Sequence, residues 1–216
     1  MNSNDGGFWD FTSDLAMKDM AYTKEGLGVH TDNAYFTDPA GLQMFHLLSH
    51  TNGEGGESVL VDGFEAARTL YRENRNAYST LRRSVFSHHA SGNQDVCIKP
   101  ARSFPTFLHS PRTQELYQVR WNNEDRGAQF SASLEKLRHW YSAARAWSEI
   151  LSRPGLVRQF KLEPGTPLIF DNWRMLHGRT AFTGARRMCG GYINHDDFVS
   201  RYELLNKGRE QVLLEI

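Results

Sequence analysis

The chain has 216 residues, and its 25 Lys and Arg residues balance its 25 Asp and Glu residues, so the formal net charge is zero. A balanced chain has no overall field that would attract nucleic acid or an anionic membrane surface, so neither is expected as a partner. Its uninterrupted apolar runs are only about four residues long, as at 167–170, which is far too short to cross a bilayer.

The first half of the chain predicts two strands followed by a helix. Residues 41–49 and 58–61 are apolar or alternating, and the turn-forming stretch 52–56 separates them, so both segments are predicted strands. Asp62 is placed to cap one helix that runs to about residue 83. Residues 84–110 have no assignable pattern. A further strand pair is predicted at 116–121 and 128–130.

The second half contains the clearest helix, which opens at Ser133 and runs to about Ser152. Its apolar stripe predicts core packing rather than a cofactor site, and it comprises Leu137, Trp140, Tyr141, Ala144, Trp147 and Leu151. A turn at 163–166, strands at 167–170 and 187–193, and a short helix from Asp196 to about residue 205, with Gly208 beyond it, complete the chain. Because strands outnumber helices and come in pairs, we expect one domain over 1–216, a β-sandwich or barrel with covering helices.

A metal-binding pattern is formed by His30, Asp32 and His177. His30 and Asp32 are two residues apart, so on an extended segment both side chains point to the same face. One more imidazole, from His177 near a distant strand, completes a set of two histidines and one carboxylate. Such a set occupies one face of an octahedral Fe(II) and leaves three positions open. The other seven histidines are not expected to be ligands.

Residues that suit a carboxylate ligand and a cationic ligand accompany this pattern. Arg186 follows His177 across a turn and can clamp a carboxylate bidentately, and Ser58 offers a hydroxyl to the same carboxylate. Trp9 and Tyr22, upstream of His30, offer aromatic faces of the kind that attract a quaternary ammonium group.

The two cysteines, Cys97 and Cys189, are too few for a disulfide framework or a structural zinc site, so both are predicted to be reduced thiols. Reduced thiols indicate an intracellular protein. The polar first seven residues lack the features of a signal or transit peptide. The cytoplasm and the mitochondrial matrix both stay open as compartments.

Several short motifs together resemble the carnitine-biosynthesis branch of the TauD/TfdA-like Fe(II)/2-oxoglutarate dioxygenases, which acts on trimethyllysine and on γ-butyrobetaine. The resemblance runs from about residue 7 to residue 205. The motifs that carry it are Ala21-Tyr22-Thr23-Lys24, His30-Thr31-Asp32, Leu60-Val61-Asp62-Gly63-Phe64, Asn122-Asn123, Phe170-Asp171-Asn172-Trp173-Arg174-Met175-Leu176-His177-Gly178-Arg179 and Phe182-Thr183-Gly184-Ala185-Arg186.

The resemblance implies a double-stranded β-helix (jelly-roll) core that binds Fe(II), with 2-oxoglutarate as cosubstrate and ascorbate as reductant. It assigns the iron to the triad of His30, Asp32 and His177. The distal carboxylate of 2-oxoglutarate goes to Arg186 and Ser58, and Arg187 is the alternative clamp. The residues implied to contact a small-molecule substrate are Trp9, Tyr22, Asp19 and Asn122.

The implied reaction is hydroxylation of N6,N6,N6-trimethyllysine to 3-hydroxy-trimethyllysine, the first step of carnitine biosynthesis. Three alternatives stay open: hydroxylation of γ-butyrobetaine, a catalytically impaired chain that acts only as a binding module, and a zinc hydrolase. The family members carry an N-terminal zinc-binding domain before the catalytic fold. We therefore expect an N-terminally shortened catalytic domain, and a homodimer stays open beside a monomer.

Overall fold

The computed structural model describes residues 7–12, 23–92, 95–128 and 132–215. The described strands are β1 (Phe8–Thr12), β2 (Leu27–His30), β3 (Leu42–Thr51), β4 (Ser58–Asp62), β5 (Val85–Phe86), β6 (Phe104–Pro105), β7 (Phe107–His109), β8 (Leu116–Val119), β9 (Val157–Phe160), β10 (Leu168–Asp171), β11 (Met175–Arg179) and β12 (Ala185–Ile193). The helices are α1 (Gly63–Glu73), α2 (Arg75–Arg83), α3 (Leu134–Leu151), α4 (His195–Lys207) and α5 (Arg209–Leu214).

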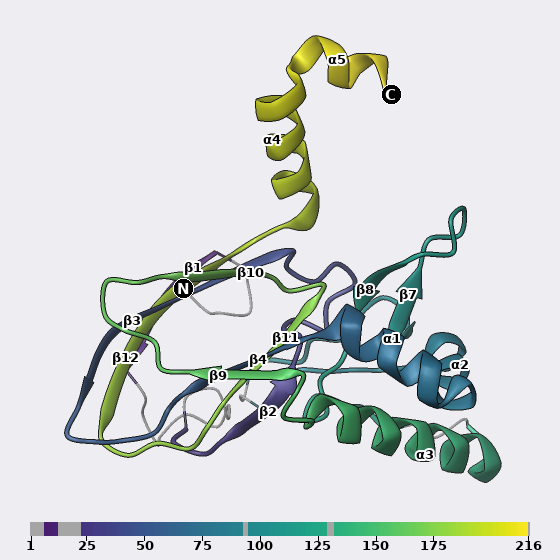
Figure 1. Cartoon of the computed structure of the whole chain (residues 1–216), viewed down its shortest axis with the longest axis horizontal. Helices are drawn as coiled ribbons and strands as arrows, with labels where there is room; N and C mark the ends of the chain where they lie inside the picture. Colours follow the sequence, from purple (N-terminus) through teal and green to yellow (C-terminus); the bar gives the residue numbers. More distant parts are fainter. Residues whose placement is uncertain (1–6, 13–22, 93–94, 129–131, 216) are drawn as a thin grey trace.

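Two four-stranded antiparallel sheets form the body of the protein (Figure 1). Their strand orders are β1-β12-β3-β10 and β2-β11-β4-β9, so strands that are distant in the sequence lie next to each other. Both sheets contribute side chains to one interior cavity. This interleaved, antiparallel arrangement is that of a jelly roll, and the expected mainly-β core with covering helices is confirmed.

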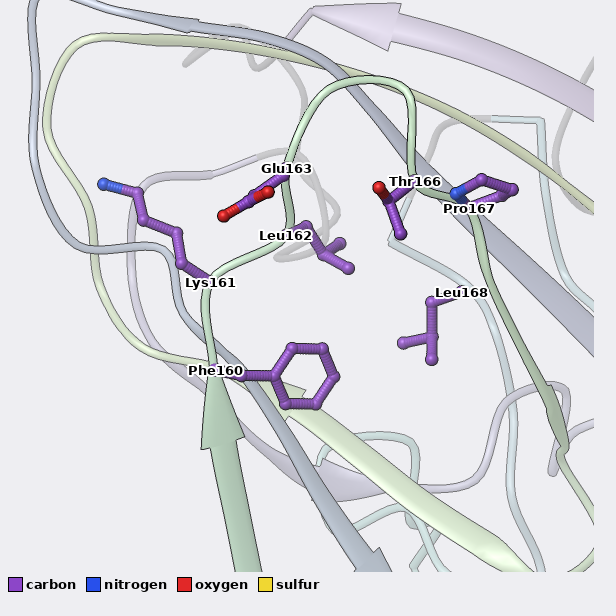
Figure 2. A pocket seen from close by; sticks show the side chains of 7 residues that line it. All are labelled: Phe160, Lys161, Leu162, Glu163, Thr166, Pro167 and Leu168. Atoms are coloured by element: carbon purple, nitrogen blue, oxygen red, sulfur yellow. The ribbon is translucent and has the colours of Figure 1, made fainter.

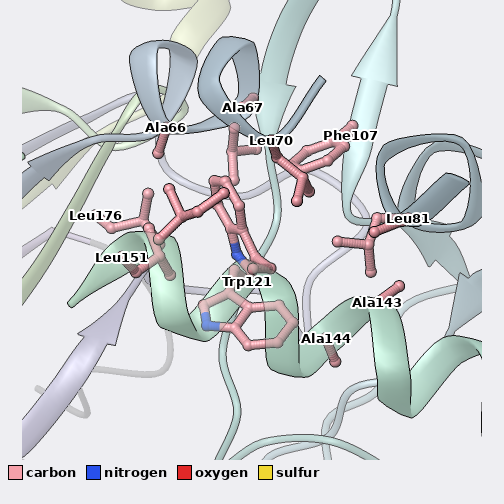
Figure 3. Close-up of a cluster of buried hydrophobic side chains, with 14 of the residues drawn as sticks. Ala66, Ala67, Leu70, Leu81, Phe107, Trp121, Ala143, Ala144, Leu151 and Leu176 are labelled. Carbon is pink, nitrogen blue, oxygen red and sulfur yellow. The ribbon is translucent and has the colours of Figure 1, made fainter. Parts of the chain in front are cut away.

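Helices α1 and α3 share a buried cluster with the outer face of the sheet that contains β4 and β11, and α2 packs on both helices (Figures 1 and 3). Trp147 and Leu70 come from these helices, and Val61 and Leu176 come from the sheet; all four are fully buried. The predicted helix at 133–152 is therefore confirmed as a core element. Tyr141 is the exception in its predicted stripe, because it remains 51% exposed.

The single helix predicted from Asp62 to residue 83 is in fact two helices. Asp62 caps α1 as expected, and its Oδ1 accepts hydrogen bonds from the amides of Phe64 at 2.9 Å and Glu65 at 3.2 Å. Asn74 then leaves the helical conformation with φ −146°, and its side chain accepts from the Ala77 amide at 2.9 Å to cap α2. An Asn competes for backbone donors in this way, which is why it favours helix starts over interiors.

The predicted pairing of 116–121 with 128–130 is wrong. Strand β8 pairs instead with β7, with Phe107 opposite Val119. Ala128 lies outside every strand, and residues 129–130 lie outside the described part of the chain. The pattern missed β9, which pairs with β4 along its length. Because β9 is an edge strand with largely exposed side chains, it lacks the apolar alternation of a half-buried strand.

The two C-terminal helices extend away from the sheets (Figure 1). Helix α4 starts at the Asn194 cap and ends at Gly208, whose φ of 79° favours glycine. No side chain of α4 or α5 is buried. Within the described residues, no helix combines the length and apolar character that a membrane span requires.

Candidate metal centre and cavity

His30, Asp32 and His177 come together on the wall of the interior cavity. His30 ends β2 and lies opposite His177 of β11 in the antiparallel register, and Asp32 follows two residues after His30. Asp32 Oδ1 lies 3.2 Å from His30 Nε2 and 3.6 Å from His177 Nε2. Among the described residues this is the one group of three or more His, Cys, Asp or Glu side chains with ligand atoms this close, all within 4.8 Å of one another.

The charges of the three groups suit a divalent cation. Burial alone would raise the pKa of Asp32, but the two imidazoles, His177 above all, hold it well below its usual range. Burial and the neighbouring His30 lower the pKa of His177, so this imidazole stays neutral. Burial is the largest influence on His30 and opposes its protonation, but the hydrogen bond and the charge of Asp32, together with the Gly28 carbonyl, outweigh burial and raise the pKa of His30. A carboxylate and two imidazoles are the donor set of non-haem Fe(II) sites.

The orientation of the His30 ring is set by its own strand. His30 Nδ1 lies 2.8 Å from the carbonyl oxygen of Gly28 and donates a hydrogen bond to it. Because this hydrogen bond keeps a proton on Nδ1, Nε2 is the ring nitrogen that faces Asp32, and it would become a metal ligand on losing its own proton.

The cavity has a volume of about 500 Å³ and lies between the two sheets and the loops around residues 89–92 and 122–125. Its wall includes the three candidate ligands and the predicted site residues Trp9, Ser58, Asn122 and Arg186. A smaller pocket of about 180 Å³, at the turn between β9 and β10, is lined by residues from Phe160 to Leu168 (Figure 2). That smaller pocket lies apart from the candidate ligands and holds no comparable group of donors.

Arg186 and Arg187 point to opposite sides of β12. Arg187 is on the outside, where it donates to both carboxylate oxygens of Asp10, at 3.0 and 2.7 Å. Arg186 is only 5% exposed and lines the cavity. Within the described residues its guanidinium has neither a hydrogen bond nor an ion pair. Its charged neighbour is Arg179, and burial together with that neighbour lowers the pKa of Arg186 to about 10.

A buried cation without an acidic partner creates a strong preference for an anion. Gly56, with φ 72°, lies beside this side chain, and a Cβ there would be 3.6 Å from Nε of Arg186. Ser58, on β4 of the other sheet, is buried and lines the same cavity. The two residues expected to hold a carboxylate therefore line one cavity from different sheets.

The residues expected to contact a substrate are described only in part. Trp9 is buried beside Phe45, and its ring fits because a Cβ at Gly190 would lie 2.4 Å from it. Asn122 lines the cavity and donates to Asp125 Oδ2 at 2.7 Å. Tyr22 and Asp19 lie outside the described residues.

Sequence reasoning missed three residues that surround Asp32. Gln43 Nε2 and the Tyr192 hydroxyl both donate to Asp32 Oδ2, the latter at 2.8 Å. Asn172 holds the backbone, since its Oδ1 accepts from the Asp32 amide at 2.8 Å and its Nδ2 donates to the Asp32 carbonyl at 3.1 Å. The signal available in the sequence for Gln43 was a single Gln inside the largely apolar stretch 41–49, where a polar residue needs a reason.

The family model of the "Taurine catabolism dioxygenase TauD, TfdA family" matches residues 1–192. The chain is 47% identical to trimethyllysine dioxygenase of Neurospora crassa, covering 96% of this chain and 51% of the relative. It is 39% identical to the mitochondrial trimethyllysine dioxygenase of Homo sapiens, with 93% and 48% covered. Human γ-butyrobetaine dioxygenase is 28% identical, covering 94% of this chain and 53% of the relative. The chain thus spans about half the length of these relatives.

Solved structures share the fold at low sequence identity. An asparagine oxygenase in complex with Fe(II), hydroxyasparagine and succinate matches with a TM-score of 0.64 and 16% identity, covering 87% of this chain and 56% of that one. The oxygenase OrfP, in complex with Fe and α-ketoglutaric acid, matches with a TM-score of 0.62 and 14% identity over 90% and 58%. These similarities establish the jelly-roll oxygenase fold.

Proposed function

The chain belongs to the taurine catabolism dioxygenase TauD, TfdA family, and from that premise we propose that it catalyses hydroxylation of N6,N6,N6-trimethyllysine at C3 with Fe(II) and 2-oxoglutarate. The carrying observation is that the His30–Asp32–His177 group lines the same cavity as Arg186, which is buried and has no acidic partner among the described residues. A metal site alone fits many reactions, whereas a metal site together with a buried anion site fits a cosubstrate that carries a carboxylate.

The residues present fit an Fe(II) ion. His30 and His177 would bind it through Nε2, and Asp32 would bind it through a carboxylate oxygen. When bound, the iron would supply the activation of dioxygen that the protein's own side chains cannot provide. Ascorbate would keep the metal reduced.

One end of the cosubstrate, its distal carboxylate, would be held by two side chains. Arg186 would bind the distal carboxylate of 2-oxoglutarate with charge-assisted hydrogen bonds, and the Ser58 hydroxyl would donate to the same group. Because Arg186 is buried, the local dielectric is low, which strengthens this pairing. These residues would act within one catalytic domain over residues 1–216.

The aromatic part of the cavity would hold the trimethylammonium group of the substrate. Trp9 offers its ring there, and Tyr22 is proposed to offer a second. Asn122 and Asp19 are proposed to contact the amino-acid end of trimethyllysine, whose α-ammonium γ-butyrobetaine lacks. Relatives named trimethyllysine dioxygenase are 39–48% identical to this chain, against 28% for γ-butyrobetaine dioxygenase, which supports trimethyllysine.

Two further properties are the compartment and the oligomeric state of the protein. The human and chicken relatives are named as mitochondrial, which supports the mitochondrial matrix over the cytoplasm. A homodimer stays a prediction beside a monomer, to be decided by the mass of the purified protein in solution.

The substrate proposal is tested by incubating the purified chain with Fe(II), ascorbate, 2-oxoglutarate and either trimethyllysine or γ-butyrobetaine. Mass spectrometry should show the gain of one oxygen atom on trimethyllysine, with succinate formed in equal amount. A gain of oxygen on γ-butyrobetaine alone would show that γ-butyrobetaine, and not trimethyllysine, is the substrate. Retained binding of 2-oxoglutarate with no product from either compound would leave only the binding-module function.

The metal assignment is tested by removing each ligand in turn. His30→Ala, Asp32→Ala and His177→Ala should each abolish stoichiometric Fe(II) binding, because a three-ligand site that loses one donor retains only two. Metal content after desalting measures this. His139→Ala, on the exposed side of α3, is the matched control and should bind iron like the parent. Full retention of iron in all three ligand variants would contradict the assignment.

A further inference from the structure

The two oxygens of the Asp32 carboxylate have different surroundings. Oδ1 faces the two imidazole nitrogens, at 3.2 and 3.6 Å. Oδ2 accepts two hydrogen bonds, one from the Tyr192 hydroxyl at 2.8 Å and one from Gln43 Nε2. An ionised carboxylate is an acceptor only, so both groups must present hydrogens to it.

The two donors are placed by the sheet itself. Gln43 of β3 and Tyr192 of β12 are direct cross-strand partners in the antiparallel register, so their side chains lie side by side on the cavity face. Gln43 is 1% exposed, and its Oε1 has no hydrogen-bond partner among the described residues. Among the described residues, the Gln43 side chain therefore makes a single hydrogen bond, the one to Asp32. We take this bond to set the orientation of the Gln43 amide.

From this asymmetry we propose that Tyr192 and Gln43 are positioning residues that restrict Asp32 to a single metal-binding oxygen, Oδ1. Oδ1 is the oxygen nearest the imidazoles, and with both hydrogen bonds made the lone pairs of Oδ2 are occupied, so Oδ2 is not available as a second ligand. A bidentate carboxylate would fill two positions on the metal. A carboxylate that binds through Oδ1 alone would leave one of them open. The inference rests on the proposed function, because a dioxygenase site needs three open positions.

The test is titration of the 216-residue chain with Co(II), followed by its visible absorption, which reports both affinity and coordination. Tyr192→Phe keeps the aromatic ring and removes only the hydroxyl, and Gln43→Met keeps the length and removes the amide. Each should lower the Co(II) affinity by about 10- to 100-fold, the usual effect of losing a group that orients a ligand. Each should also change the absorption bands of the saturated protein, which a purely structural role would not do.

The matched control is Tyr78→Phe, which removes a tyrosine hydroxyl that hydrogen-bonds His109 outside the cavity. It should bind Co(II) like the parent and give the same spectrum. Circular dichroism of the metal-free variants verifies their fold, and if one of them fails to fold, the other decides.

Two outcomes separate the inference from the function on which it rests. If both folded variants keep the parental spectrum and bind Co(II) within about twofold of the parent, the positioning role is wrong while the metal site stands. If the parent does not bind Co(II), or if His177→Ala binds it as tightly as the parent, the metal centre and the inference fail together.

Discussion

The sheet that contains β11 separates two very different interiors. On its outer face, Leu176 packs among the buried side chains of α1 and α3. The next residue, His177, points to the inner face and lines a cavity of about 500 Å³. Adjacent residues of one strand thus belong to a filled apolar layer and to a partly hollow, polar site, because strand side chains alternate between faces.

This contrast indicates how the molecule divides its tasks. The helical layer is closely packed around Trp147, Phe107 and Leu70, none of which is exposed. Inside the jelly roll, a second apolar cluster of Trp9, Leu47, Leu162 and Met188 is much smaller, and most of the other residues that line the cavity are polar or charged. The first interior supplies stability, and the second keeps room for ligands.

The largest effect on stability is expected from breaking the filled layer. Trp147→Ala should lower the free energy of unfolding by about 3–5 kcal/mol, because it removes a fully buried ring that packs on Phe107 and Trp121. Tyr141→Ala, on the exposed side of the same helix, should change it by less than about 0.5 kcal/mol. Urea denaturation measures both. Equal losses in the two variants would contradict the division between a packed and an exposed face of α3.

A second effect should appear on acidification, at a histidine buried outside the metal centre. Burial, aided by Arg120 and Arg126, lowers the pKa of His88 to about 4. An unfolded chain takes up this proton near pH 6.5, so between pH 6.5 and 4 the unfolded state binds more protons. Stability is therefore lost as the pH falls through this window, by at most about 3 kcal/mol from this group.

The His88 prediction is checked by urea denaturation of the metal-free protein at several pH values between 7 and 4. His88→Gln cannot take up the proton, so its stability should fall less steeply than that of the parent across the window. Parallel pH profiles for the two proteins would show that His88 does not titrate as its burial implies.

The third effect concerns the hollow interior alone. Arg186→Ala should weaken 2-oxoglutarate binding by about 10- to 100-fold, because the carboxylate loses a charge-assisted pair of about 1.5–3 kcal/mol. Arg187→Ala removes only the surface pair with Asp10 and should leave the affinity within about twofold. Calorimetric titration with 2-oxoglutarate measures both. The reverse pattern would place the carboxylate on the other side of β12.

The sequence predicted best where the signal is local. The Asp62 cap, the helix after Ser133 and the strands at 41–49 and 58–61 depend on neighbouring residues, and all were found. The break at Asn74 was missed because the apolar spacing continues through it. The partner of β8 was missed because pairing depends on contacts between segments far apart in the chain.

By itself the sequence determined the Asp62 cap, the helix after Ser133, the mainly-β class and the set of His30, Asp32 and His177, since capping, periodicity and residue chemistry are written along the chain. Only the tertiary structure decided which of Arg186 and Arg187 faces the cavity, and that Gln43 and Tyr192 meet at Asp32. A strand pattern says that neighbours alternate, but it does not say which face is inside. That choice follows from the pairing of β3 with β12 and of β2 with β11, and so from packing across the whole barrel.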